Sequence, residues 1–374
     1  MQRSLKMIKP FHILDTMTGL KRSFRKREGE GNGILLISSG GLGDTVLFSL
    51  FANRFASLAR ENEPVTVLLR SDAAKMAFLL PKRMGLEIVN FSELRKSLGY
   101  RRKIANRLFN SHYRLIITTD QLRHPDLDEA LIKMASPDEA IAMEPRSWPK
   151  YDDALQRNRQ LYSRLFDSGP DRTDKVVRWN KFANWLTGEE RPAPVVRIDL
   201  ETSPGDTPDV LIQPFSAVAA KQSPVGLYRR IIDALPDGLN IAITGAPNDL
   251  EANPEYKQLL ELPGVSFNCS TFQDLAPSLK AAKLVISVDT ATMHLAVALG
   301  APTLCLASAA YVGEIVPYAT EITPDNAHVI YHSMDCEGCL GKCYLEPIED
   351  MYPCVAALDG DYVISKIQNL IQEL

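Results

Sequence analysis

Three glycines and one carboxylate lie where an apolar run ends and a helical pattern begins. In ILLISSGGLGDTVLFSL (residues 34–50) they are Gly40, Gly41, Gly43 and Asp44. Glycines let a backbone approach a ligand closely and adopt positive φ. Neither GxxxxGK[ST] nor GxGxxG fits this segment, which argues against those two phosphate-binding loops. An unperturbed aspartate is ionised at pH 7, so Asp44 can act as a general base, or it can simply cap the helix.

A second segment, LVISVDTATMHLAVALGAPTLCL (residues 284–306), places polar residues between a predicted strand and a predicted helix. Asp289, Thr290 and Ala291 fall at the turn, and His294 lies about one turn into the helix. The N–H groups of a helix start bind phosphate, and a side chain one turn along can reach back toward the same anion. Capping by Asp289 and Thr290, with a buried and hydrogen-bonded His294, explains the same residues without a ligand.

A third segment, IQPFSAVAAKQSP (residues 212–224), puts Ser216 and a single cation, Lys221, after a predicted strand end. A loop of small residues with one cation suits a diphosphate that arrives over the edge of the sheet. An isolated lysine is also common on solvated surfaces, so this segment needs the other two beside it.

Four of the six cysteines cluster near the C-terminus, in MDCEGCLGKCYLEPIEDMYPC. They are Cys336, Cys339, Cys343 and Cys354. In a reducing compartment this spacing is compatible with a structural zinc or iron ion, and two disulfides or four free thiols are the alternatives. Cys269 and Cys305 have apolar neighbours, which predicts that both belong to the core.

Length and composition indicate a globular protein of two domains. The chain has 374 residues, of which 45% are hydrophobic and 24% charged. A net charge of -4 argues against nucleic acid as a partner. No apolar run is long enough to cross a bilayer and no secretory signal begins the chain, so a cytoplasmic location is expected.

Basic residues concentrate in two stretches. Residues 1–27 combine apolar side chains with eight basic ones against Asp15 alone, which suits either an anionic membrane surface or a frayed, solvated tail. Residues 95–114 carry a second basic stretch, which suits either a phosphorylated or lipid-borne partner or a solvated helix face.

Apolar runs alternate with helical patterns, the rhythm of parallel α/β sheets. Strands are expected at 34–38, 65–69, 86–90, 114–119, 210–213, 240–244, 284–288 and 302–307. Helices are expected at 47–58, 92–111, 148–185, 227–235, 255–262, 272–282, 293–299 and 362–374. A Pro- and Gly-rich stretch near residues 187–209 reads as a linker.

Taken together, these segments resemble glycosyltransferase family 9, the ADP-heptose:lipopolysaccharide heptosyltransferases. The family motifs stand here as GGLGD (40–44), KQSP (221–224) and SVDTATMHLAVALGAPT (287–303). A further family element, a strand followed by G-A-P and an acid, stands as TGAPND (244–249) and contributes Asp249. Three positions depart from the family pattern and put the identity of the donor sugar in doubt: Ala291, Ser223 and the segment 307–309.

The resemblance implies a GT-B fold, with two Rossmann-like, doubly wound domains facing across a cleft. It implies an inverting transfer of a sugar, heptose favoured, from a nucleotide diphosphate sugar, with no metal required for catalysis. Asp44 would be the general base beside the acceptor loop of Gly40, Gly41 and Gly43. The donor would be held by residues of the C-terminal domain, namely Ser216, Lys221, Asp249, Asp289, Thr290, Ala291 and His294.

These inferences predict a lipopolysaccharide-type or other glycan acceptor, lipid-linked or not, and a peripheral position on the inner face of the membrane. The expected divisions are a basic segment (1–30), an acceptor domain (31–200), a donor domain with the cysteine patch (201–360) and a C-terminal helix (361–374). A non-catalytic nucleotide-sugar-binding or assembly protein and a nucleotide-sugar 2-epimerase are the alternatives.

Overall fold

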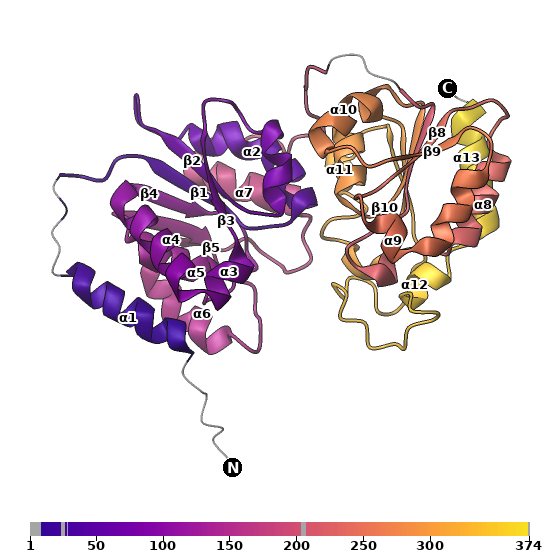
Figure 1. Ribbon diagram of the computed structural model, residues 1–374. Helices are drawn as coiled ribbons and strands as arrows, with labels where there is room; N and C mark the ends of the chain where they lie inside the picture. The colour runs from indigo at the N-terminus through magenta and orange to yellow at the C-terminus, as the bar shows by residue number, and fades with distance from the viewer. Residues whose placement is uncertain (1–8, 24–26, 28, 203–206, 373–374) are drawn as a thin grey trace, which may run out of the picture. The chain divides into compact units, whose positions relative to one another are not determined.

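The structure, a computed structural model, describes residues 9–23, 27, 29–202 and 207–372. Within them the chain forms two compact units, each built on a six-stranded sheet (Figure 1). Neighbouring strands of both sheets run parallel. The prediction of two Rossmann-like, doubly wound α/β domains is confirmed.

The first sheet has the strand order β3-β2-β1-β4-β5-β6. Its strands are β1 (Ile34–Ser38), β2 (Val65–Arg70), β3 (Gly85–Val89), β4 (Leu115–Thr118), β5 (Glu139–Met143) and β6 (Arg164–Phe166). The helices up to residue 187 are α1 (Pro10–Ser23), α2 (Leu42–Ala56), α3 (Phe91–Lys96), α4 (Leu98–Ser111), α5 (Asp128–Ala135), α6 (Asp152–Asn158) and α7 (Lys175–Thr187), with 3₁₀ turns η1 (Ala73–Leu79) and η2 (Arg159–Leu161).

Strand β1 lies at the centre of the first sheet because all five of its residues are buried. Its register pairs Ile34 with both Val65 and Leu115. On one face, Leu35 and Ile37 pack with apolar residues of α4 and α5, whereas right-handed crossovers place α2 on the other face (Figure 1).

The second sheet has the strand order β12-β11-β10-β7-β8-β9. Its strands are β7 (Val210–Gln213), β8 (Ile241–Thr244), β9 (Val265–Asn268), β10 (Leu284–Val288), β11 (Thr303–Leu306) and β12 (Ala327–Ile330). Its helices are α8 (Val225–Ala234), α9 (Asp249–Ala252), α10 (Phe272–Ala281), α11 (Ala291–Ala298), α12 (Pro353–Ala356) and α13 (Gly360–Gln372), with 3₁₀ turns η3 (Ala219–Lys221), η4 (Pro254–Glu261), η5 (Ala309–Tyr311) and η6 (Thr320–Ile322).

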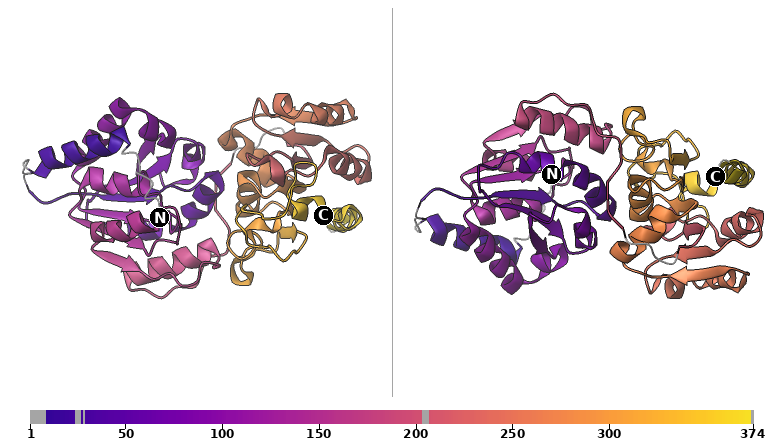
Figure 2. Two further views of the ribbon diagram at one scale, coloured as in Figure 1. Left: turned by 90° about the horizontal axis from the view of Figure 1, so that it is seen from below. Right: turned by 90° about the horizontal axis from the view of Figure 1, so that it is seen from above.

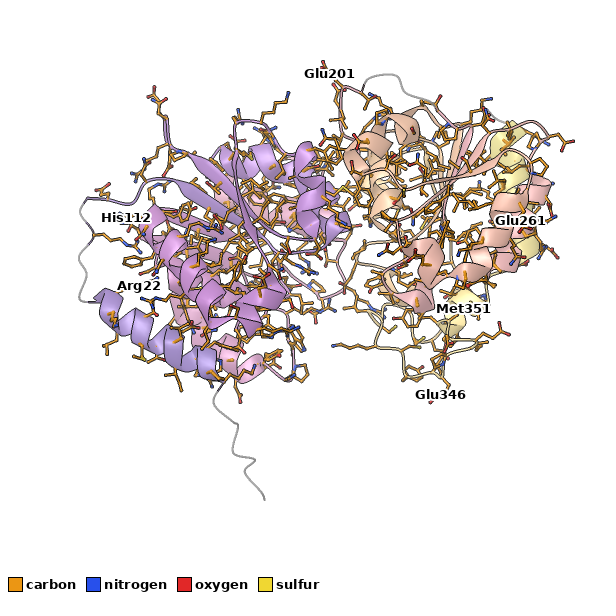
Figure 3. All side chains as sticks on the ribbon, viewed as in Figure 1. Arg22, His112, Glu201, Glu261, Glu346 and Met351 are labelled. Carbon is orange, nitrogen blue, oxygen red and sulfur yellow. The ribbon has the colours of Figure 1, made fainter. Side chains whose placement is uncertain are left out.

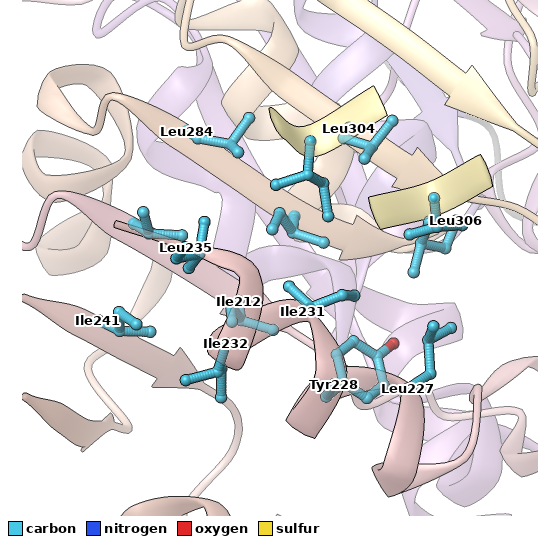
Figure 4. Packing of buried hydrophobic residues seen from close by; sticks show 14 of the residues in the cluster. Ile212, Leu227, Tyr228, Ile231, Ile232, Leu235, Ile241, Leu284, Leu304 and Leu306 are labelled. Carbon is cyan, nitrogen blue, oxygen red and sulfur yellow. The ribbon is translucent and has the colours of Figure 1, made fainter. Parts of the chain in front are cut away.

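The core of the second unit forms where α8 and α13 cover one face of this sheet. Ile212 of β7 and Leu304 of β11 lie in the same buried cluster as Tyr228 and Ile231 of α8, and all four are labelled in Figure 4. This close packing of branched side chains fixes the strand ends that carry the polar loops.

Several expected elements differ in the structure. The helix expected at 92–111 is two helices, because Ser97 is extended and its side chain caps Tyr100 N at 3.2 Å. The helix expected at 148–185 is wrong in part, because strand β6 interrupts it. The segment expected as a helix at 255–262 is the 3₁₀ turn η4. Residues 10–23 form α1 rather than a frayed tail, and residues 1–8 and 24–26 lie outside the described residues.

Candidate active site

Each sheet has one point at which its strand order reverses, between β1 and β4 in the first and between β7 and β10 in the second. Ligands of open α/β sheets bind outside the carboxyl ends of the strands at such a point. The loops that follow these strands contain most of the predicted site residues. The topology therefore gathers residues that lie far apart in the sequence at two strand edges.

Asp44 lies in the first turn of α2, directly beyond the end of β1. Its Oδ2 accepts a hydrogen bond from Gly41 N at 2.7 Å, and Gly41 is the N-cap of the helix. The capping function considered for this residue is therefore present in the structure. A carboxylate at a helix N-terminus is also favoured in its ionised form, which a general base requires.

Gly40 is needed because the Asp44 side chain occupies the space beside it. A Cβ at Gly40 would lie 2.5 Å from Asp44 Cβ, whereas one at Gly41 would meet nothing closer than 3.7 Å. The expectation that the loop uses positive φ is wrong, because Gly40, Gly41 and Gly43 all lie outside the positive-φ region. Close approach of the side chain explains Gly40.

A buried acid that the sequence analysis missed holds this loop from the neighbouring strand. Asp120 follows β4, and its Oδ2 accepts Ser39 N at 2.9 Å. Nearby, burial raises the pKa of Asp128 to about 6, and the charge of Asp120 adds to this effect. The sequence does contain a signal for Asp120, because this acid directly follows a predicted buried strand, as Asp289 does.

An aromatic group lies on the loops that follow β4 and β5. The His124 ring is 4.4 Å from Tyr151 and 5.8 Å from Trp148, centroid to centroid. His124 Nε2 lies 3.0 Å from Tyr151 Oη, and burial lowers the pKa of His124. A partly apolar surface of this kind is suited to the face of a sugar ring.

In the second unit, Lys221 and Asp289 meet at the switch point. Lys221 Nζ donates to the main-chain oxygen of Asp289 at 2.8 Å and forms an ion pair with its Oδ1 at 3.0 Å. Ser308 Oγ donates to Asp289 Oδ2 at 3.1 Å. Both members of the pair are buried, and burial raises the pKa of Asp289 against the opposing effect of Lys221. The lysine expected to be an isolated cation is thus held by a carboxylate from the next loop.

The start of α11 lies beside this pair. Thr290 is the N-cap but makes no side-chain capping bond, so the capping explanation for this turn is not supported. Ala291 and Thr292 begin the helix, and Thr292 Oγ1 donates to Gln213 Oε1 at 3.3 Å. His294 is buried, and its Nδ1 lies 2.6 Å from Tyr318 Oη, as the alternative of a hydrogen-bonded core histidine predicts.

The remaining predicted donor residues lie on the loops that follow β7 and β8. Ser216 Oγ accepts Val218 N at 3.2 Å, which shapes the loop before Lys221. Asp249 Oδ2 accepts Ala246 N at 2.6 Å. Gln213, which the sequence analysis missed, joins these loops to α11, because its Oε1 also accepts Thr244 Oγ1 at 2.7 Å.

The cysteine patch lies against the same loops. Cys354 Sγ accepts a hydrogen bond from Ala309 N at 3.3 Å, and Tyr352 N donates to Ala220 O at 2.8 Å, next to Lys221. Met351, beside α12, and Glu346, farther along the same loop, are labelled in Figure 3. The patch therefore supports the loop that carries the cation.

The cysteines do not form a complete metal site within the described part of the chain. Cys336 Sγ lies 4.0 Å from Cys343 Sγ, and burial together with the neighbouring thiols raises the pKa of Cys336 to about 11. No three His, Cys, Asp or Glu side chains converge as metal ligands among the residues described. Of the two cysteines expected in the core, Cys305 is buried but Cys269 is exposed, so the prediction for Cys269 is wrong.

A cavity of about 450 Å³ lies beneath α1, and its lining, which includes Asp15, Arg101 and Lys133, shares no residue with either loop site. None of the described helices has the length and apolar character that crossing a membrane would require.

Two doubly wound domains with polar loops at both switch points are an architecture that glycosyltransferases use. The family model described as Glycosyltransferase family 9 (heptosyltransferase) matches residues 142–342, more than half of the chain. The chain belongs to glycosyltransferase family 9. A comparison with curated proteins finds no match.

Solved structures share the fold. A family 9 glycosyltransferase from Veillonella parvula DSM 2008 is 16% identical with a TM-score of 0.66, covering 93% of this chain and 99% of that one. E. coli heptosyltransferase WaaC with ADP is 20% identical with a TM-score of 0.66, covering 90% and 99%. E. coli ADP-heptose lps heptosyltransferase II is 14% identical with a TM-score of 0.63, covering 91% and 99%.

Proposed function

We propose that the protein is an inverting glycosyltransferase that moves a sugar from a nucleoside diphosphate sugar to a hydroxyl of a glycan acceptor. ADP-heptose is the favoured donor, since similar folds are those of a heptosyltransferase with ADP and an ADP-heptose heptosyltransferase. A lipopolysaccharide-type, lipid-linked molecule is the favoured acceptor. The observation that carries the proposal is the Lys221–Asp289 pair at the switch point of the second sheet.

On the donor side, bond cleavage builds negative charge on the leaving diphosphate. Asp289 engages the Lys221 ammonium at two oxygens, and an ammonium has three donors, so one proton can serve a phosphate oxygen. The N–H groups at the start of α11 supply fixed dipoles that point the same way. Fixed donors of this kind stabilise developing charge without reorganisation, and each is worth about 10²–10³ in rate.

On the acceptor side, Asp44 would accept the proton of the attacking hydroxyl, a contribution of about 10²–10⁴ in rate. In this assignment residues 31–200 bind the acceptor and residues 201–360 bind the donor. The His124–Trp148–Tyr151 rings would stack on the acceptor sugar.

Thermal unfolding with nucleotides tests the donor assignment, because a ligand that binds only the folded state raises the melting temperature. We expect ADP and ADP-heptose to stabilise the protein. Lys221→Gln should weaken that stabilisation, whereas Lys283→Gln, which alters an exposed lysine paired with Asp209, should not. Equal nucleotide affinity in both variants would reject the phosphate-binding assignment of Lys221.

Asp44→Asn tests the general base without removing the helix cap, because an amide oxygen can still accept Gly41 N. Transfer should fall by about 10²–10⁴ while the melting temperature and nucleotide affinity stay unchanged. The capping bond favours a second candidate, a non-catalytic nucleotide-sugar-binding or assembly protein. Undiminished transfer by the variant would leave Asp44 as a cap alone, and no transfer by the wild type would favour the second candidate.

Although the four sulfurs do not converge in the structure as described, we also propose that Cys336, Cys339, Cys343 and Cys354 close on a structural zinc or iron ion when one binds. In a tetrahedral site with Zn–S bonds of about 2.3 Å, two sulfurs lie about 3.8 Å apart, close to the 4.0 Å between Cys336 and Cys343. Elemental analysis of protein purified without chelators should find one ion per chain, lost in Cys336→Ser and kept in Cys269→Ser. A metal-free wild type would reject the proposal.

A further inference from the structure

Helix α1 is fastened to the first unit by polar contacts along one side. Arg101, buried on α4, donates to Asp15 through Nε at 2.8 Å and Nη2 at 2.6 Å. The Arg101 guanidinium also lies 4.5 Å from the ring of Phe11, which is 5% exposed. Near the end of the helix, Arg22 donates to Met134 O at 2.7 Å. The side of α1 that faces the protein is therefore rich in charge.

The opposite side of α1 is apolar and faces solvent. Ile13, Met17 and Leu20 are 55%, 56% and 63% exposed. At 100° per residue these positions fall within a sector of roughly 60°, about opposite to Phe11 and Asp15. A surface helix ordinarily buries its apolar stripe and exposes its charges. This helix instead exposes its apolar stripe and turns Asp15 and Arg22 toward the protein, and Figures 1 and 2 show it on the outside of the first unit.

The charges around this stripe are positive. Asp15 is the single acid among residues 1–27, and Arg101 holds it on the inner side of the helix. Lys21 is exposed beside the stripe, and Lys9, exposed just before the helix, forms an ion pair with Asp126. An apolar stripe with cations at its border matches the boundary between the headgroups and acyl chains of an anionic bilayer.

We propose that α1 is a docking helix that lies in the plane of an anionic lipid membrane, with Ile13, Met17 and Leu20 in the acyl boundary. A second copy of the chain fits this face less well, since pairing two such helices would bring their cations together. The inference goes beyond the proposed transfer reaction, because it names the surface that meets the membrane and needs no enzymatic activity to test.

Co-sedimentation of the full-length protein with vesicles tests the proposal. Wild type should bind vesicles of phosphatidylglycerol mixed with phosphatidylcholine, bind phosphatidylcholine alone more weakly, and lose affinity as salt rises. The triple variant Ile13→Gln, Met17→Gln, Leu20→Gln should lose binding on the order of 10- to 100-fold. Glutamine favours helix, so α1 is retained.

The matched control is Leu86→Thr with Ile88→Thr, which removes two exposed apolar side chains, each 44% exposed, from strand β3. This control should bind vesicles as wild type does, and both variants should keep the wild-type melting temperature and nucleotide affinity. Equal vesicle binding by the triple variant and wild type would overturn the proposal. So would a concentration-dependent dimer that the triple variant abolishes, because the stripe would then meet a second copy.

Discussion

Replacing Gly40 by alanine probes the fit between the loop after β1 and the Asp44 carboxylate. The new Cβ would lie 2.5 Å from Asp44 Cβ and 2.6 Å from Oδ2. Non-bonded carbons approach to about 3.5 Å, so the Asp44 side chain must move by about 1 Å. The 2.7 Å bond from Gly41 N to Oδ2 cannot survive that shift unchanged.

The size of the effect follows from this displacement. Moving a reacting group by about 1 Å costs on the order of 10²-fold in rate, and loss of a helix cap costs about 1 kcal/mol of stability. Gly41→Ala is the matched control, since its Cβ would meet Asp44 Oδ2 at 3.7 Å, an ordinary contact, and its φ of -80° suits alanine. Gly40→Ala should therefore lose transfer, and Gly41→Ala should keep most of it.

The assay measures the release of ADP from ADP-heptose in the presence of a lipid-linked acceptor, with ADP affinity measured in parallel. We expect Gly40→Ala to slow release by on the order of 10²-fold while ADP affinity stays at the wild-type value. Wild-type turnover by Gly40→Ala would show that the position of Asp44 does not limit the chemistry. An equal loss in both alanine variants would point to the mobility of the loop instead.

Three other outcomes are expected. Lys221→Gln leaves the buried Asp289 carboxylate without its cation and should destabilise the fold by about 3 kcal/mol. Adding Asp289→Asn should recover much of that loss, as measured by denaturant unfolding in a double-mutant cycle. Additive effects of the two substitutions would contradict the pairing. Because burial raises the pKa of Asp128 from 3.8 to about 6, its stabilising contribution is complete below pH 4 and is lost as the pH rises through 6. The free energy of unfolding of Asp128→Asn, relative to that of wild type, should thus rise by up to about 3 kcal/mol between pH 4 and pH 8. Parallel curves of stability against pH for the two proteins would refute this. Arg101→Gln should free α1, seen as faster amide hydrogen exchange at residues 10–22, and unchanged exchange would show that the Asp15 contact is dispensable.

The central strands could be predicted from sequence because burial on both faces leaves a continuous apolar run. ILLIS, VLIQ and LVISV coincide with β1, β7 and β10. Four strands among the described residues were missed. Strands β6, β9 and β12 lie at sheet edges, where half-exposed residues break the apolar pattern. Strand β5 is an inner, buried strand, but its sequence EAIAM contains two alanines, a residue depleted in strands. The pairing of an edge strand depends on the rest of the sheet, and no local sequence pattern predicts it.

The site could be predicted where an acidic residue follows the end of a buried strand, as Asp44 and Asp289 do. The partners of these residues were not, since Lys221 and Asp289 are separated by 68 positions and meet only through the parallel pairing of β7 with β10. Asp120 gives the same signal, directly after the strand expected at 114–119, and was overlooked; its partner Ser39, on the other side of the switch point, could not be predicted. Contacts across a switch point require the strand order, which local periodicity does not contain.

The bonds from Cys354 to Ala309 and from Tyr352 to Ala220 have a consequence for biosynthesis. All strands of the second sheet are complete by Ile330, yet the loop that carries Lys221 gains this support only after residue 354 has left the ribosome. Both sheets can therefore form before the loop that carries Lys221, the proposed phosphate ligand, gains this support.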